Sequence, residues 1–321
     1  MAALKGLERI LKKNYNKLVD PEAAKEAVQR VIGEHSRLTG EPLNLLKKLT
    51  KVAYHVIKAF PDDFDVLDLQ KIHGYNIDGI NRSKVEQVQR EAARGGSITE
   101  LLVYQSHFYR QAASIQTHLF RRTGNLVWLE KSYVSQINSG NLTYDFNPDY
   151  TSYRYFKAGK IAEKIYDFNK ESKGLTEDLE LLSDAYDAYE QSSVLSVKNN
   201  TAHSIKSNIR AGKVAERIAN EIKDKNHGEQ LGHRLTWLEK AYQRNNMAVK
   251  MENTYSWKPE FGICRENAAR VAGELYKETG NPLWKQRSFE QYDVLRDRSI
   301  GQLQRERFEV AKQNLDFESQ V

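Results

Sequence analysis

Apolar residues recur along the chain at the three- and four-residue spacing of one helix face. Four segments share this pattern, with small residues followed by larger apolar ones: 112–120, 158–166, 211–218 and 268–276. Offsets of 0, 3, 4 and 7 place such residues on one side of a helix. A second pattern follows each segment, a large residue and then a small–aromatic pair: Trp128…Ser132-Tyr133, Leu181…Ala185-Tyr186, Trp237…Ala241-Tyr242 and Trp284…Ser288-Phe289. The sequence therefore predicts four pairs of helices.

The spacing of the two patterns indicates a repeat. From the alanine of each first helix (Ala112, Ala158, Ala211, Ala268) to the small residue of the second helix, the separations are 20, 27, 30 and 20 residues. From that small residue to the next alanine they are 26, 26 and 27. Insertions, expected to be loops at about 169–177 and 223–236, thus fall between the two helices of a pair. We expect an all-α, right-handed α-solenoid of stacked helical hairpins.

Turn residues and side-chain sizes agree with stacked hairpins. Thr123-Gly124-Asn125 and Thr279-Gly280-Asn281-Pro282 each join a first helix to a second. Glycine suits the left-handed position after a helix, asparagine caps the next helix, and proline fits its first turn. The small residues allow helices to approach closely, and the tryptophan and tyrosine side chains are expected to fill the space between pairs as core rather than bind a cofactor.

The pattern resembles tetratricopeptide-like (TPR-like) repeats, with paired helices, small residues at close contacts, aromatic plugs and a turn-forming glycine. The resemblance covers roughly residues 104–300, and a fainter copy lies at 22–58, with Ala24, Ala27, Val31 and then Leu49…Ala53-Tyr54. Its first-helix alanines lie 46, 53 and 57 residues apart, against about 34 in the family. The family's Trp-x-x-Leu-Gly-x-x-Tyr string is absent. The resemblance implies a non-catalytic surface that binds peptides or proteins.

The same patterns divide the chain into four parts. Residues 1–60 are expected to form an N-terminal basic helical module, 61–103 an irregular or helical join, and 104–290 the repeats. Residues 291–321 are expected to form a C-terminal capping helix, a long polar helix whose approximate bounds are 290–318. In the join, the acids of 62–68 are interpreted as helix-start residues. The segment His73–Gly79 is interpreted as a loop, followed by a helix from about Arg82 to Arg94.

Composition and charge narrow the classes of function. The 321 residues are 40% hydrophobic, and Gly 18 and Pro 6 are few, which favours helices. No run approaches the roughly 20 apolar residues that span a bilayer. The net charge of +6 belongs to residues 1–60, with twelve basic and six acidic residues. No secretory signal is expected, and a cytoplasmic location is the default expectation.

The basic N-terminus predicts an amphipathic helix. The apolar stripe of this helix consists of Leu4, Leu7, Leu11 and Leu18. The cations around the stripe are Lys5, Arg9, Lys12, Lys13 and Lys17. The helix either docks on the first repeat, which we favour, or binds a polyanion or a membrane surface. A membrane surface is not the expected partner.

Motifs for catalysis and metal binding are missing from the sequence. His227, Glu229 and His233 lie in one insertion, where a solvated loop is favoured over a weak metal site. The single cysteine, Cys264, has no flanking signature and is expected to be buried. Neither a glycine-rich phosphate loop nor a serine elbow occurs. We expect no cofactor, no metal and no enzymatic activity. An enzyme whose active-site pocket leaves no motif in the sequence is kept as a third hypothesis.

Two groups of residues are candidate partner-binding sites. A basic stripe on the first helices contains Lys157, Lys160, Lys164, Arg210, Lys213, Arg217 and Arg270. It is either a track for phosphates or an acidic partner, or a solvated face balanced by Glu163, Glu216 and Glu274, which we favour. The tyrosine-rich segment 144–156, with Tyr150, Tyr153 and Arg154, either grips a peptide or stacks bases, or packs between repeats with its phenolic ends at the surface, which we favour.

The leading hypothesis for function is a protein–protein interaction scaffold that binds a peptide or protein. The alternative is binding of an RNA or DNA backbone through the basic stripe and the N-terminal helix.

Overall fold

The computed structural model describes residues 26, 28–29, 43–60, 64–92, 98–173, 179–225, 230–252, 259–299 and 302–318. The chain divides into two compact units, Met1–Ile161 (unit 1) and Ala162–Val321 (unit 2). The division falls inside one helix, α7. The predicted N-terminal amphipathic helix, with Lys5, Arg9, Lys12, Lys13 and Lys17, lies outside the described residues.

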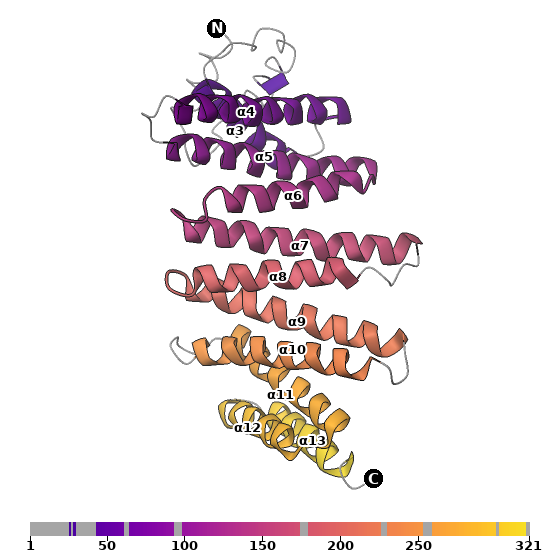
Figure 1. Ribbon diagram of the computed structural model, residues 1–321. Coiled ribbons are helices and arrows are strands. Elements are labelled where there is room, and N and C mark those ends of the chain that lie inside the picture. The colour runs from indigo at the N-terminus through magenta and orange to yellow at the C-terminus, as the bar shows by residue number, and fades with distance from the viewer. Residues whose placement is uncertain are drawn as a thin grey trace. The chain divides into compact units, whose positions relative to one another are not determined.

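The described residues form helices and no strand, which confirms the predicted all-α class (Figure 1). Unit 1 contains α3 (Leu43–Ala59), α4 (Val66–Ala92), α5 (Thr99–Thr123) and α6 (Val127–Asn141). Helix α7 (Pro148–Lys173) begins in unit 1 and ends in unit 2. Unit 2 continues with α8 (Leu179–Ser196), α9 (Thr201–Lys225), α10 (Leu231–Glu252), α11 (Pro259–Thr279), α12 (Pro282–Arg298) and α13 (Gln302–Glu318).

Successive helices pack against one another from α3 to α6 in unit 1 and from α8 to α13 in unit 2. The small residues of the predicted first helices α5, α7, α9 and α11 are buried, among them Ala112, Ala158, Ala211 and Ala268. In unit 1, α3 packs against both α4 and α5. Helices α3 and α4 therefore form a further hairpin in which α3 is the first helix. This corrects the interpretation of Leu49…Ala53-Tyr54, which lie in α3, as a second-helix pattern. We call α3, α5, α7, α9 and α11 the first helices and α4, α6, α8, α10 and α12 the second helices.

The predicted turn chemistry is confirmed at both Thr-Gly-Asn connections. Gly124 and Gly280 both have φ of 65°, the left-handed conformation that glycine adopts without steric cost. The Oδ1 atom of Asn125 accepts a hydrogen bond from the backbone N–H of Val127 over 3.1 Å. Asn281 accepts the equivalent bond from Leu283 over 3.0 Å. These connections are tight because the local sequence satisfies the exposed ends of both helices.

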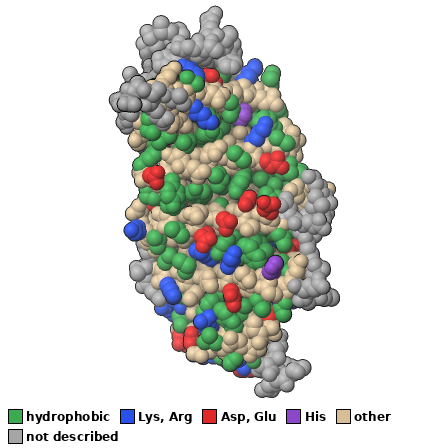
Figure 2. Space-filling model, in the orientation of Figure 1, with side chains coloured by type: hydrophobic (Ala, Val, Ile, Leu, Met, Phe, Trp, Pro, Cys, Tyr) green, Lys and Arg blue, Asp and Glu red, His purple; other side chains and the backbone are tan. Residues whose placement is uncertain are grey.

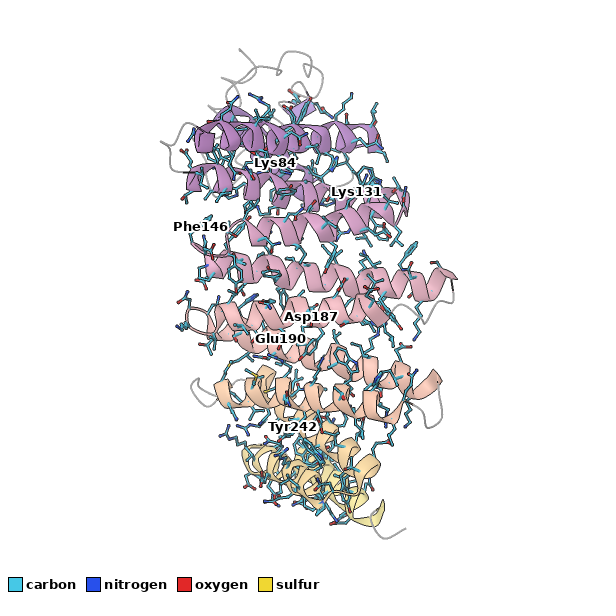
Figure 3. The ribbon with its side chains drawn as sticks, in the orientation of Figure 1. Lys84, Lys131, Phe146, Asp187, Glu190 and Tyr242 are labelled. Atoms are coloured by element: carbon cyan, nitrogen blue, oxygen red, sulfur yellow. The ribbon has the colours of Figure 1, made fainter. Side chains whose placement is uncertain are left out.

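Aromatic side chains join the second helices, as predicted for the space between pairs. In unit 2, the rings of Tyr186 and Trp237 meet edge-on with centroids 5.3 Å apart. The rings of Tyr242 and Trp284 do the same at 5.0 Å; Tyr242 is labelled on α10 in Figure 3. Edge-on geometry brings the positive edge of one ring to the negative face of the other.

The same arrangement occurs in unit 1 with a histidine in place of the tyrosine. His73 of α4 and Trp128 of α6 meet edge-on at 5.4 Å. His73 therefore holds the position in its hairpin that Tyr186 and Tyr242 hold in theirs.

The loop predicted over His73–Gly79 is wrong, because these residues lie in the middle of α4. Glycine has a low intrinsic helix propensity, but tertiary packing can override it. Gly79 has such a packing role. A Cβ atom at this position would lie 2.6 Å from the Phe108 ring of α5. The helix-start interpretation holds for Asp65, whose Oδ1 accepts a hydrogen bond from the N–H of Asp68 over 2.7 Å. Helix α4 thus starts at Val66, well before the predicted Arg82.

Two further expectations are corrected by helix ends. The insertions at 169–177 and 223–236 are largely helical, since α7 runs to Lys173, α9 runs to Lys225 and α10 begins at Leu231. The long polar helix over 290–318 is instead two helices, α12 and α13, and Ser299 follows the end of α12 in an extended conformation. Helix α13 buries Phe308 and Leu315 against Tyr292 and Leu295 of α12, which is the capping role that the polar C-terminus predicted.

Candidate functional site

The predicted basic residues on the first helices of unit 2 lie beside carboxylates. Three ion pairs connect neighbouring first helices: Arg210–Glu163, Arg217–Asp167 and Arg270–Glu216. The Nη2 atom of Arg270 lies 2.6 Å from Oε2 of Glu216, and Glu274 lies one turn further along α11 with its Oε1 3.4 Å from Nη1. The carboxylates of Glu163, Glu216 and Glu274 were expected to balance this face, and each contacts one of its arginines.

A surface hollow of about 440 Å³ lies beside these pairs. Its lining combines Lys213, Arg217 and Arg270 with the carboxylates of Glu216 and Glu221. Exposed ion pairs contribute only about 0–1 kcal/mol each and leave little net charge for a partner. Lys164 and Lys213 are exposed, as is Lys160 in unit 1. Side chains of both signs are also interspersed on the face drawn in Figure 2.

Unit 1 has a different arrangement at the start of α7. The Oδ1 atom of Asn147 accepts a hydrogen bond from the N–H of Tyr150 over 3.1 Å and starts the helix. Tyr150, Tyr153, Arg154 and Lys157 then share one face at helical spacing. The Arg154 guanidinium lies 4.8 Å from the Tyr150 ring centroid and 4.6 Å from that of Tyr153. The structure therefore brings together all four of the predicted residues from this part of the chain.

Arg154 is held by its neighbours rather than extended into solvent. Its residue exposure is only 6%, and its Nη1 donates a hydrogen bond to Oε1 of Gln136 over 3.3 Å. Tyr153 remains 43% exposed, and the Lys157 ammonium lies 5.3 Å from its ring centroid. A buried guanidinium between two tyrosine rings is the type of residue that dominates binding energy at interfaces.

The neighbouring first helices add cations and aromatic rings to this face. From α5, the His107 ring lies 6.1 Å from the Tyr150 ring. The Arg110 guanidinium lies 5.7 Å from the Tyr54 ring of α3. We call the whole set the cation–tyrosine cluster: Lys47, Lys51, Tyr54, Tyr104, His107, Arg110, Tyr150, Tyr153, Arg154 and Lys157.

Electrostatics show that the cation–tyrosine cluster carries an excess of positive charge. Burial and then the charges of Arg110, Lys47, Lys51 and Arg154 lower the pKa of His107 to about 4. Burial, together with nearby Arg110, also lowers the pKa of Arg154. Burial lowers the pKa of Lys47, and Glu100 opposes that shift. Among the largest causes of these three shifts, Glu100 is the carboxylate, and the other charged side chains are cations or tyrosines. Within the described residues, the cluster therefore has fewer carboxylates beside its cations than the first helices of unit 2 have.

Two atoms of the cluster are buried without a hydrogen-bond partner among the described residues. They are the Nε atoms of Arg110 and Arg154. Leaving a buried N–H unpaired costs about 1–3 kcal/mol, and more for a charged group. A buried polar group of this kind calls for an explanation, such as strain, a bound water or a bound ligand.

Sequence reasoning missed Lys47, Lys51, His107 and Arg110. The three-residue spacing of His107 and Arg110 indicates one helix face, but nothing in the local sequence pairs that face with α3 or α7.

Sequence reasoning also missed a regular feature of the second helices. The third residue after each tryptophan is a cation whose charge lies over that ring: Lys131, Lys240 and Arg287 at 4.9, 4.0 and 4.6 Å from the centroid. Lys131 is labelled in Figure 3.

Groups suited to metal binding or nucleophilic chemistry are not assembled in the described residues. No three His, Cys, Asp or Glu side chains there could hold a metal ion. Cys264 is buried as expected, and burial followed by the Glu252 carboxylate raises the pKa of its thiol to about 12. Among the described helices, none has the length and apolar character needed to cross a membrane.

Comparison with known proteins supplies no family. The sequence matches no protein-family model and no curated protein. Two similar solved structures are a circular tandem repeat protein with a novel repeat topology and a de novo designed helical repeat protein. Each is 13% identical to this chain in sequence. The match to the tandem repeat protein covers 99% of this chain and 69% of that protein, with a TM-score of 0.32. The match to the designed protein covers 94% of this chain and 98% of that protein, with a TM-score of 0.20. At these TM-scores neither similarity contributes to the argument about function.

Proposed function

We propose that the chain is a protein-interaction scaffold that binds an acidic peptide segment on the first helices of unit 1. The observation that carries this proposal is the cation–tyrosine cluster, in which Arg154 is buried between Tyr150 and Tyr153 beside other cations and far fewer carboxylates. Tyrosine and arginine together supply apolar area, hydrogen bonds and charge to a bound chain. The resemblance to tetratricopeptide-like repeats belongs to the same proposal, because that family binds peptides on the same kind of surface.

A peptide fits the charges better than a nucleic-acid backbone does. Binding along a phosphate backbone needs a series of available cations, because each neutralised phosphate adds to affinity. In unit 2, Arg210, Arg217 and Arg270 already contact carboxylates. Among the cations that the structure describes, those of the cluster in unit 1 have fewer carboxylates beside them, which suits a short acidic segment.

The test is a selection of random displayed peptides against the whole chain, followed by anisotropy measurements on the peptides recovered. We expect the recovered peptides to be rich in Asp and Glu. The double variant Arg110→Gln/Arg154→Gln is expected to weaken them at least tenfold at 150 mM salt. The matched control is Arg217→Gln/Arg270→Gln, which removes the same charge from ion-paired positions and should leave the affinity within about twofold.

A parallel titration uses single-stranded RNA and DNA 12-mers at 50 and 200 mM salt. Nucleic acid that binds more tightly than every selected peptide at 200 mM salt would contradict the proposal and support the alternative function. Equal weakening by the two double variants would also contradict it, because binding would then follow total charge rather than the cluster. Circular dichroism of each variant establishes that the helices remain intact.

A further inference from the structure

We propose that Arg110 and Arg154 together form a binding site for a phosphate monoester group carried by the bound peptide. The inference rests on the proposed function, since it names the group by which the acidic segment is anchored. Its first support is the pair of buried Nε atoms without hydrogen-bond partners. In a guanidinium, Nε–H and one Nη–H point the same way and form a fork for two oxygens of one anion. Two such forks match the several oxygens of a phosphate.

The charge of the cluster favours a dianion over a single carboxylate. Five basic side chains contribute to it: Lys47, Lys51, Arg110, Arg154 and Lys157. The Glu100 carboxylate opposes the lowering of the Lys47 pKa, whereas Lys47, Lys51, Arg110 and Arg154 all lower the pKa of His107. In unit 2, by contrast, the single guanidinium of Arg270 contacts two carboxylates, Glu216 and Glu274. A phosphate monoester carries a charge of about −1.5 to −2 at neutral pH, which offsets more of the excess than a carboxylate can.

The arrangement of aromatic rings indicates how the group reaches Arg154. Tyr150 and Tyr153 hold the guanidinium between them, and Tyr153 is the more exposed, at 43%. Rotation of the exposed Tyr153 side chain uncovers an edge of the guanidinium, and such rotamer changes are fast at a surface. His107 lies on the other side of Tyr150, and an anion nearby would raise its lowered pKa.

The experiment compares three fluorescein-labelled peptides, Ala-Gly-X-Gly-Ala, in which X is serine, glutamate or phosphoserine. Anisotropy is measured with the whole chain at 50 and 150 mM salt, and inorganic phosphate is added as a competitor. We expect the phosphoserine peptide to bind at least tenfold more tightly than the glutamate peptide. Arg110→Gln and Arg154→Gln should each reduce that affinity at least tenfold. Arg154→Lys, which keeps the charge but removes the fork, should reduce it about fivefold. Arg217→Gln is the control and should change nothing.

The outcomes separate this inference from the proposed function. Equal affinity for the glutamate and phosphoserine peptides would overturn the phosphate site while leaving an acidic-peptide scaffold in place. Undetectable binding of the phosphoserine peptide at 1 mM protein would overturn it too. If inorganic phosphate binds as tightly as the phosphoserine peptide, the site is one for free phosphate. That result would contradict the proposal that the phosphate is carried by a peptide. An effect of Arg217→Gln equal to that of Arg154→Gln would reduce the interaction to general charge attraction.

Discussion

Ser288 of α12 donates a hydrogen bond from its Oγ to the backbone carbonyl of Ala269 on α11, over 2.7 Å. Ser132 makes the same bond to Ala113 in unit 1, also over 2.7 Å. A serine side chain reaches a backbone carbonyl only where two helices are nearly in contact. The small residues of the second-helix pattern therefore mark the closest approach of each hairpin, and all four are buried: Ser132, Ala185, Ala241 and Ser288.

Shortening or enlarging Ser288 tests this close contact. Ser288→Ala should lower the free energy of unfolding by about 1 kcal/mol, because one hydrogen bond is lost without a cavity. Ser288→Leu should lower it by 3 kcal/mol or more, since the added volume must separate α11 from α12. Urea denaturation measures both, with the exposed Ser172→Ala as the control, expected within about 0.5 kcal/mol of wild type. A tolerated leucine would show that the hairpin is not tightly packed here.

Two glycines of α4 should respond oppositely to alanine. Gly79→Ala places a Cβ atom 2.6 Å from the Phe108 ring and should destabilise the protein by about 1–3 kcal/mol. Gly74 has no atom within 4 Å of an added Cβ, so Gly74→Ala should stabilise it by about 0.5–1 kcal/mol through helix propensity. Chemical denaturation of the two variants decides the matter. Stabilisation by both would mean that Phe108 moves aside freely.

The ion pair of Glu252 and Arg265 is the most deeply buried of those described, with side chains 1% and 6% exposed. Its Glu252 Oε2 and Arg265 Nε lie 3.1 Å apart. Glu252→Gln should cost about 3–5 kcal/mol, because the buried guanidinium of Arg265 loses this carboxylate. Replacing both residues by methionine should recover most of that loss. Asp78→Asn, at the exposed pair with Arg82, is the control and should cost under about 1 kcal/mol.

Acid should destabilise unit 1 partly through His73. Burial, and then the charge of Lys131, lowers the pKa of His73 to about 4, from 6.5 in an unfolded chain. Between these values the unfolded chain binds a proton that the folded chain does not, so stability is lost as the pH falls through this window. His73→Phe keeps a ring against Trp128 and removes the titration. The fall in Tm from pH 7 to pH 4.5 should therefore be smaller in this variant, whereas the exposed His233→Gln should reproduce the wild-type fall.

Local chemistry made the hairpins predictable from sequence. Gly124 and Asn125 encode a tight turn within three residues, and Gly280 with Asn281 encodes it again. The buried alanines and the aromatic plugs recur at a fixed step, so each copy supports the interpretation of the others. The segment around Gly79 was misread because its glycine is explained by Phe108, a contact distant in the sequence.

The candidate site was predictable only where it lies on one helix. Tyr150, Tyr153 and Arg154 share a face of α7 and were identified. Lys47 and Arg110 come from α3 and α5, and their meeting depends on the lateral packing of three helices, which no local spacing encodes. The sequence predicted that Glu163 and Glu216 would neutralise arginines of the basic stripe, and both form ion pairs with them. It did not predict the ion pair of Asp167 with Arg217.

Helix α13 packs against both helices of the last described hairpin, α11 and α12. An array in which each hairpin contacts only its neighbours has no intrinsic length, since the exposed side of its final hairpin offers the same apolar surface as every hairpin before it. Phe308 and Leu315 occupy that surface on α11 and α12, whereas residues 302–307 of α13 are exposed, Leu303 among them at 83%. Any further helix or second chain that approached this hairpin would therefore have to displace Phe308 and Leu315 before it reached the apolar side of α11 and α12.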